Sequence, residues 1–233
     1  MRKICLYKEN EKMNKGKLRI VVLFSGGASA AQYLIGNDPN YGKNYKFVFG
    51  LTDKKDASGL SYFDEQEIPC TIAAIKQFNA RNGYFGKVRD MPDNIRRAYF
   101  THLQHIVKQF EPDLILLSGF MLKIVAPLLG YCPIINVHPA DLRIKKEDGT
   151  PKYTGDDAVT LAINAGETST ASTIHVVEKK VDEGKIICVS QPLTVQPEVP
   201  IIEHQNRMKI FCDGPAYIRA LEMICSGEFK FEA

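Results

Sequence analysis

The stretch LRIVVLFSGG, at residues 18–27, does most to decide the fold. Its first seven residues are almost continuously apolar, which is typical of a strand buried on both faces of a sheet. The serine and the two glycines that follow predict a tight turn, and residues 28–35 then have the pattern of a helix. A buried strand that turns directly into a helix predicts an α/β fold.

Strand and helix patterns keep alternating after this stretch. We expect an α/β fold with a mostly parallel, twisted sheet that is flanked by helices and Rossmann-like in its first half. The predicted strands are residues 46–51, 69–75, 113–117, 133–137, 172–177 and 186–193. The predicted helices are residues 57–66, 92–110, 120–129, 156–165 and 201–224, the last of them broken or kinked at Gly214-Pro215.

Length and composition predict one globular domain over residues 17–233, preceded by a polar arm at 1–16 that could add a short strand at 4–7. We divide the domain into a nucleotide-binding-like half at 17–132 and a catalytic half at 133–233. The net charge of +3 is too small to indicate a nucleic-acid partner. No apolar run is long enough to cross a membrane, and the first residues lack the apolar stretch of a signal peptide, so we expect a cytoplasmic protein without a membrane partner.

Two short segments have the residue types that anion binding and acyl transfer need. Ser25-Gly26-Gly27 would offer backbone N–H groups and a helix dipole to an anion, although a tight turn needs glycine whether or not anything binds. Asn136 and His138 stand two apart at the end of a predicted strand, so their side chains point to the same side. An amide can stabilise an oxyanion and an imidazole can move a proton, but the same pair could simply cap a strand.

Further polar residues have ordinary explanations when each is taken alone. A carboxylate at Asp182 close to His138 would favour the imidazolium and fix its orientation, yet Asp before Glu-Gly is also common turn chemistry. His175 has apolar neighbours and is predicted to be a core histidine. His102 and His105 are predicted to lie on a solvated helix face. The six cysteines form no CxxC pair, so we expect no metal site.

Five segments, in this order, resemble the folate-dependent formyltransferases. They are Leu23–Gly27, Ser118–Met121, Ile135–Pro139, Ser172–Val177 and Val181–Ile187. The combination of Asn-x-His-Pro with a later Asp-x-Gly-x-Ile-Ile is the specific part of the likeness, which covers residues 18 to 193. The resemblance implies transfer of a formyl group from 10-formyltetrahydrofolate, as formyl donor, to a primary amine. The expected partner is a small phosphorylated amine, glycinamide ribonucleotide of purine biosynthesis in the first place, and the expected state is a monomer or homodimer.

The resemblance also implies roles for individual residues. Asn136 would hold the formyl oxygen, His138 would be protonated in the intermediate and shuttle a proton, and Asp182 would order a proton-relaying water. Residues expected to bind the folate are Gly119, Phe120, Met121, Leu122, Lys123, Ile124, Lys179, Lys180 and Val181. Residues expected to approach the substrate phosphate are Ser25, Gly26, Gly27, Ala28, Ser29 and Ala30.

Four departures from the family pattern fall on the amine side or its loops. Ala28 replaces the second glycine of the phosphate loop, and Ala30 replaces an asparagine. Leu122-Lys123 stands where arginine is common, Asp141 to Tyr153 carries extra charged residues, and the segment 205–211 lacks the usual Gln-x-x-Glu-His. The acceptor therefore stays open: another amine, such as a nucleotide-linked amino sugar, and water, as in a formylfolate hydrolase, are alternatives. A folate-binding protein without activity is a further alternative, against which the intact Asn136, His138 and Asp182 argue.

Overall fold

The structure is a computed structural model that describes residues 16–232, grouped in two compact units. Unit 1 comprises residues 16–28, 39–134 and 231–232, and unit 2 comprises residues 29–38 and 135–230. The predicted strand at residues 4–7, and all of the predicted arm except Gly16, lie outside the described residues. Residues 29–38, which contain one helix, thus belong to unit 2, although the residues on either side of them belong to unit 1.

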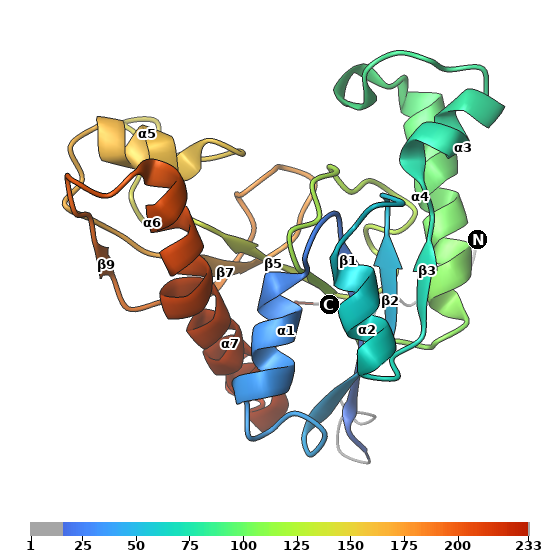
Figure 1. The fold of residues 1–233 in the computed structure, drawn as a ribbon, viewed down its shortest axis with the longest axis horizontal. Coiled ribbons are helices and arrows are strands. Elements are labelled where there is room, and N and C mark those ends of the chain that lie inside the picture. Colours follow the sequence, from blue (N-terminus) through green and yellow to red (C-terminus); the bar gives the residue numbers. More distant parts are fainter. Residues whose placement is uncertain (1–15, 233) are drawn as a thin grey trace. The chain divides into compact units, whose positions relative to one another are not determined.

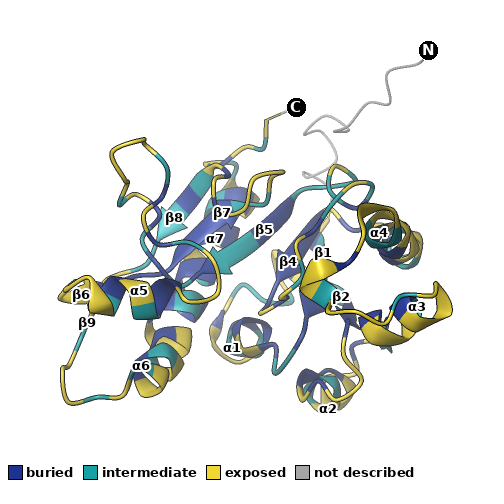
Figure 2. Ribbon diagram, turned by 90° about the horizontal axis from the view of Figure 1, so that it is seen from above, coloured by how far each residue is buried: buried dark blue, intermediate teal, exposed yellow. Residues whose placement is uncertain are grey.

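Unit 1 contains a parallel sheet in the strand order β3-β2-β1-β4. Figure 1 labels the first three of these strands, and Figure 2 labels β4. Both β2 and β4 pair with β1 in parallel, and β3 pairs with β2 in parallel. The elements of this unit are β1 (Leu18–Phe24), β2 (Tyr45–Thr52), α2 (Gly59–Glu65), β3 (Cys70–Ile72), α3 (Ile75–Arg81), a 3-10 turn (Val88–Asp90), α4 (Asp93–Lys108) and β4 (Leu114–Leu117).

Burial explains why these segments form this sheet. In β1 every side chain except that of Arg19 is buried, and β4 is buried throughout, as expected for central strands covered on both faces (Figure 2). Helix α4 buries one stripe, formed by Tyr99, Phe100, Leu103 and Val107, and the rest of its surface is half-buried or exposed.

Unit 2 contains three antiparallel strands with β7 between β5 and β8, and a separate short pair of β6 with β9. Its elements are α1 (Ser29–Asn37), β5 (Ile134–His138, counted from its second residue), α5 (Ala158–Asn164), β6 (Ser169–Thr170), β7 (Thr173–Val176), β8 (Ile186–Val189), β9 (Leu193–Thr194), α6 (Ile201–Met208), a π-helical segment (Lys209–Asp213) and α7 (Gly214–Ser226). Helices α6 and α7 follow each other through the π-helical segment (Figure 1).

The predicted α/β class, with a mostly parallel sheet flanked by helices, is confirmed, and antiparallel pairing among the described main strands is confined to unit 2. The predicted helix at 120–129 is wrong, since this segment is an irregular loop. Pro127 lacks a backbone N–H and disfavours a helical residue before it, which explains the loop. Helix α3 was not predicted; only its first residue, Ile75, falls within the predicted strand at 69–75.

The closing helix shows how the chain accommodates Gly214-Pro215. The π-helical segment precedes them, and its wider turn admits a proline ring that would collide with an ordinary α-helical turn. A Cβ on Gly214 would overlap the ring of Tyr33 in α1, so glycine lets the two helices approach closely. None of the described helices is long and apolar enough to cross a membrane.

Candidate active site

The pairing of β5 with β7 gathers four polar side chains on one face of unit 2. Asn136 lies directly opposite His175, and His138 lies directly opposite Thr173. Residues two apart in a strand, and residues opposite each other in neighbouring strands, point to the same face. The amide and the two imidazoles therefore share one surface at the end of β5.

The ring of His138 is buried, with 4% of its surface exposed, and it meets a different partner at each nitrogen. Its Nε2 lies 2.8 Å from the carbonyl oxygen of Tyr153. Its Nδ1 lies 3.5 Å from Oδ2 of Asp182. A carbonyl oxygen can only accept, so Nε2 carries the hydrogen and a neutral His138 has its lone pair at Nδ1, facing the carboxylate.

Asp182 is held beside the histidines by the backbone. It is 6% exposed and lies in the turn between β7 and β8, with a left-handed φ of 58° that aspartate tolerates better than most residues. The backbone N–H of Gly155 donates to its Oδ2 at 2.9 Å. Its Oδ1 lies 3.7 Å from Nε2 of His175. One carboxylate therefore faces both imidazoles.

Hydrogen bonds orient the amide of Asn136. Nδ1 of His175 donates to the carbonyl of Val176 at 2.9 Å, so in the neutral ring Nε2 is an acceptor. The Nδ2 of Asn136 lies 3.3 Å from that Nε2 and donates to it. Burial lowers the pKa of His175, and the hydrogen bond to Val176 and the charge of Asp182 offset the shift only in part, which favours the neutral ring. The amide nitrogen of Asn136 has a second hydrogen for another acceptor.

A close backbone approach sets the position of the turn that carries Asp182. A Cβ on Gly184 would overlap the carbonyl oxygen of Val176, so only glycine fits there. Next to it, the N–H of Val176 donates to the carbonyl of Lys185 at 2.9 Å and closes the turn against β7. This close approach explains why the Asp-x-Gly motif has glycine at position 184.

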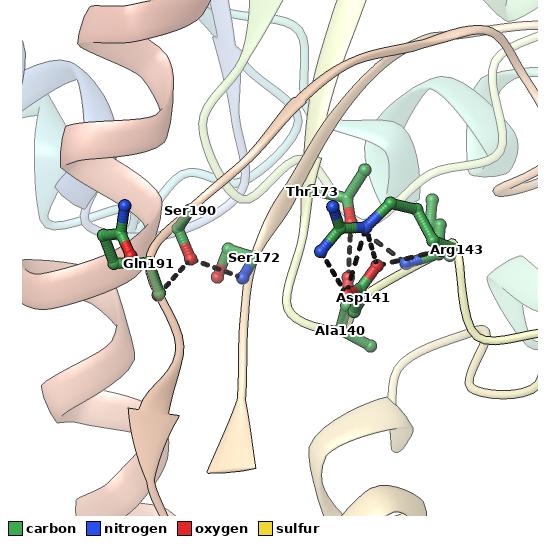
Figure 3. Close-up of polar contacts among 8 residues, drawn as sticks. Ala140, Asp141, Arg143, Ser172, Thr173, Ser190 and Gln191 are labelled. Carbon is green, nitrogen blue, oxygen red and sulfur yellow. Dashed lines mark hydrogen bonds and ion pairs between the residues drawn. The ribbon is translucent and has the colours of Figure 1, made fainter.

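The loop after His138 is tied to β7 and to itself. The hydroxyl of Thr173 donates to the carbonyl of Ala140 at 2.7 Å and accepts from the N–H of Leu142 at 3.0 Å. The guanidinium of Arg143 faces the carboxylate of Asp141, with Nη2 and Oδ2 2.7 Å apart (Figure 3). This loop is therefore fixed where it leaves the site.

Some of the residues predicted to bind the substrate and the folate contact each other in unit 1. The N–H of Ser25 donates to the carbonyl of Gly119 at 3.0 Å, and the N–H of Met121 donates to Oγ of Ser25 at 3.0 Å. Ala28 has a left-handed φ of 54°, a conformation that favours the glycine expected there. The side chains of Phe120 and Ile124 are buried, whereas Met121 is exposed.

The other predicted binding residues lie in several places. Ser29 and Ala30 begin α1 in unit 2, so the predicted phosphate loop, which includes Gly26 and Gly27, falls across the boundary between the units. Lys179, Lys180 and Val181 precede Asp182 in its turn and are exposed. Leu122 and Lys123 continue the irregular loop of unit 1. Among residues 16–232, no group of His, Cys, Asp and Glu side chains is arranged to hold a metal ion.

Two members of the cluster were missed from the sequence. His175, predicted to be an ordinary core histidine, is buried but also contacts Asn136 and Asp182. Tyr153 contributes a backbone carbonyl, which no side-chain pattern reveals. For His175 a usable signal was its place in a strand with Thr173 on the same face; the pairing partner of that strand was the missing information.

An amide donor, a buried imidazole and a buried carboxylate on one surface suit acyl-transfer chemistry, in which an oxyanion forms and a proton moves. Comparison with known proteins points to the same chemistry. The sequence model of the family described as "Formyl transferase" matches residues 18–218. The chain belongs to the formyl transferase family.

The chain is also similar to individual proteins of purine biosynthesis. The chain is 28% identical over 231 residues to the trifunctional purine biosynthetic protein adenosine-3 of Drosophila melanogaster, which covers 95% of this chain and 15% of the relative. The human protein of the same name is 25% identical over 217 residues, covering 91% of this chain and 19% of the relative. The chain therefore spans less than a fifth of the length of these two family members.

Solved structures resemble the chain over nearly its whole length. The phosphoribosylglycinamide formyltransferase of Coxiella burnetii has a TM-score of 0.74 and 26% identity, covering 94% of this chain and 92% of that protein. Glycinamide ribonucleotide transformylase 1 of Symbiobacterium toebii has a TM-score of 0.75 and 23% identity, covering 93% and 92%, and supports the fold alone. These formyltransferases are thus similar in length as well as in fold.

Proposed function

We propose that the chain transfers a formyl group from 10-formyltetrahydrofolate to the primary amine of glycinamide ribonucleotide, a step of purine biosynthesis. The observation that carries the proposal is the buried approach of His138 Nδ1 to Asp182 Oδ2, 3.5 Å apart, on the same strand face as Asn136. Family membership and the printed names of the relatives support the choice of donor and acceptor.

The reaction needs one oxyanion and one proton to be managed. The amine nitrogen bonds to the formyl carbon, the bond between that carbon and N10 of the folate breaks, and the proton lost by the amine returns to N10. In the proposed roles, Asn136 donates its second amide hydrogen to the formyl oxygen as it becomes negative. His138 carries the proton, and Asp182 stabilises the imidazolium and orders a relaying water.

The contacts of His138 indicate which of its atoms moves the proton. Because Nε2 donates to the carbonyl of Tyr153, its hydrogen is already engaged. Nδ1 faces Asp182 at 3.5 Å, a separation longer than a good hydrogen bond, so its lone pair can take a proton from a substrate group while the carboxylate stabilises the resulting charge. We therefore assign proton exchange to Nδ1.

The binding residues belong to the same proposal. Residues 119–124 and 179–181 would hold the folate, largely through backbone groups, and residues 25–30 would approach the phosphate of the acceptor. Relative to the family pattern, Ala28 adds a methyl group where glycine is usual, and Ala30 lacks the amide of the usual asparagine. The proposal includes a cytoplasmic location, as expected for a small-molecule enzyme of this pathway.

A panel of acceptors tests the function. Purified protein is supplied with 10-formyltetrahydrofolate and, in separate reactions, with glycinamide ribonucleotide, a nucleotide-linked amino sugar or no amine, and tetrahydrofolate release is followed. We expect release with glycinamide ribonucleotide at a rate well above that without amine. Release only with the amino sugar would show that it, and not glycinamide ribonucleotide, is the acceptor. Equal release without amine would indicate a hydrolase. No release in any reaction would contradict the proposed enzymatic activity.

A further inference from the structure

The charged insertion after the Asn-x-His-Pro motif folds as a small hairpin. Ile144 and Lys152 are joined by a bond from the N–H of Lys152 to the carbonyl of Ile144, at 2.9 Å. Closer to the tip, the N–H of Lys146 donates to the carbonyl of Thr150 at 2.8 Å. Both the N–H and the hydroxyl of Thr150 donate to Oδ1 of Asp148, at 2.9 and 2.6 Å. The segment is therefore internally bonded, and we call residues 144–152 the insertion hairpin.

The insertion hairpin delivers Tyr153 to the site. Its carbonyl accepts from Nε2 of His138 at 2.8 Å, and its hydroxyl donates to Oε1 of Glu167 at 2.6 Å. Its ring packs with Ala140, Ala158 and Ala162, and Ile144 of the hairpin packs against the same group. The buried Tyr153 thus connects the insertion hairpin, the carboxylate of Glu167 and the imidazole of His138.

Packing alone does not hold Tyr153 on every side. A cavity of about 130 Å³ in unit 2 is lined by Ile144 of the insertion hairpin, by Tyr153 and Glu167, and by residues of α5 and β6, which include Ala162 and Thr170. A side chain that borders a cavity lacks contacts on that side and has room to move. The hydroxyl bond to Glu167, at the wall of the same cavity, therefore helps to fix this end of the ring. Lys152 supports it, since its Nζ lies 4.9 Å from the ring centroid and 3.7 Å from Oε1 of Glu167.

We infer that the insertion hairpin and the Tyr153–Glu167 bond form a positioning device for His138. They hold the Tyr153 carbonyl on Nε2, which fixes the neutral ring as the Nε2–H tautomer and leaves Nδ1, beside Asp182, as the atom that takes and returns the substrate proton. The inference rests on the proposed function for its catalytic consequence, but the tautomer itself is a property of the resting protein. Tyr153 and Glu167 act as positioning residues through His138.

The tautomer is measured by nitrogen NMR of protein with ¹⁵N-labelled histidine rings, at a pH where His138 is neutral. The His138 signals are assigned by their absence from His138→Ala. We expect a single Nε2–H tautomer in the unaltered protein, and a mixture of tautomers in Tyr153→Phe and in Glu167→Ala, each of which breaks the anchoring bond. Glu167→Gln keeps an acceptor for the hydroxyl and should restore the single tautomer.

Turnover is measured on the same variants. Loss of the anchor should lower kcat about 10-fold, the effect of about one hydrogen bond, whereas Glu167→Gln should recover most of it. Tyr84→Phe is the matched control, since it removes a hydroxyl that donates to the carbonyl of Lys87 at 2.9 Å and leaves the insertion hairpin intact. It should change neither the tautomer nor kcat.

Two results would overturn the inference: an Nδ1–H tautomer in the unaltered protein, or an unchanged single Nε2–H tautomer in the variants that lose the anchor. If Tyr153→Phe does not fold, Glu167→Ala, a change at a partly exposed side chain, decides the question. If the unaltered protein shows the predicted tautomer shifts but no formyl transfer, the positioning device stands and the proposed function fails.

Discussion

Asp213 is a half-buried carboxyl in unit 2 that takes no part in the proposed chemistry. The hydroxyl of Ser172 donates to its Oδ1 at 2.6 Å. Burial raises its pKa to about 6, and the bond from Ser172 and the charge of Lys209 offset only part of that effect. An acid whose pKa is higher in the folded protein than in the unfolded chain makes stability depend on pH.

The consequence is a loss of stability toward neutral pH. Between the ordinary value of 3.8 and about 6, the folded protein retains a proton that the unfolded chain releases. The free energy of unfolding therefore falls as pH rises through this window and stays reduced above it. Asp213→Asn keeps an acceptor for Ser172 and removes the titration, so we expect it to be more stable at pH 7 by about 1–3 kcal/mol.

Urea unfolding of both proteins from pH 4 to pH 7 checks this prediction. The two stability curves should approach each other at the acid end and separate as pH rises. Curves that run parallel across the range would show that Asp213 does not titrate as described.

At the residue scale, the sequence predicts the polar groups better than their partners. Strand alternation was enough to place Asn136 and His138 on one face, and the structure has them so. It did not reveal that His175 lies opposite Asn136, because register between distant strands depends on the whole fold. The backbone groups of Tyr153 and Gly155 that contact His138 and Asp182 leave no trace in side-chain patterns.

The turn between β7 and β8 is the element on which the position of Asp182 depends. Gly184 allows this turn to lie against the carbonyl of Val176. We expect Gly184→Ala to force the turn away from β7, to cost about 1–3 kcal/mol of stability, and to lower turnover by more than the stability loss explains, since Asp182 moves from His138.

Thermal unfolding and turnover at a temperature where the variant stays folded measure the two effects separately. Gly36→Ala is the matched control, because a Cβ at Gly36 meets open space within α1 and alanine favours a helix. A Gly184→Ala protein as active and as stable as the Gly36→Ala control would refute the role of the turn.

Elements with strong periodicity were predictable, and those decided by local chemistry were less so. The predicted strand at 18–24 matches β1, and the helix at 92–110 matches α4 to within two residues at its end. The segment 120–129 has the apolar spacing of a helix, but it contains Pro127 and forms an irregular loop, because proline is incompatible with a helix interior. The π-helical segment before Gly214 could not be read from spacing, because it differs from an α-helix by one residue in a single turn.

For the whole molecule, the division into units does not follow the order of the sequence. Helix α1 comes from the first part of the chain, yet it belongs to unit 2, where Tyr33 packs against Gly214 of α7. The predicted boundary near residue 133 does not place α1 in unit 2, because the sequence pattern does not reveal which helices pack against each other.

This arrangement predicts that residues 135–233 do not fold when they are produced alone. Without α1, the buried face of α7, which includes Ala216, Tyr217 and Ala220, loses a packing partner. We expect circular dichroism to show no cooperative thermal transition for this fragment, in contrast to residues 17–233. A sharp transition in the fragment would mean that α1 is dispensable for unit 2.

The central claim is that Asn136, His138 and Asp182 act together on a formyl group. Tetrahydrofolate release from 10-formyltetrahydrofolate in the presence of glycinamide ribonucleotide, compared between the unaltered protein and a folded His138→Ala variant, tests it most directly. We expect the variant to turn over about 100-fold more slowly, or slower still, with its circular dichroism spectrum preserved. Equal turnover in the two proteins would contradict it.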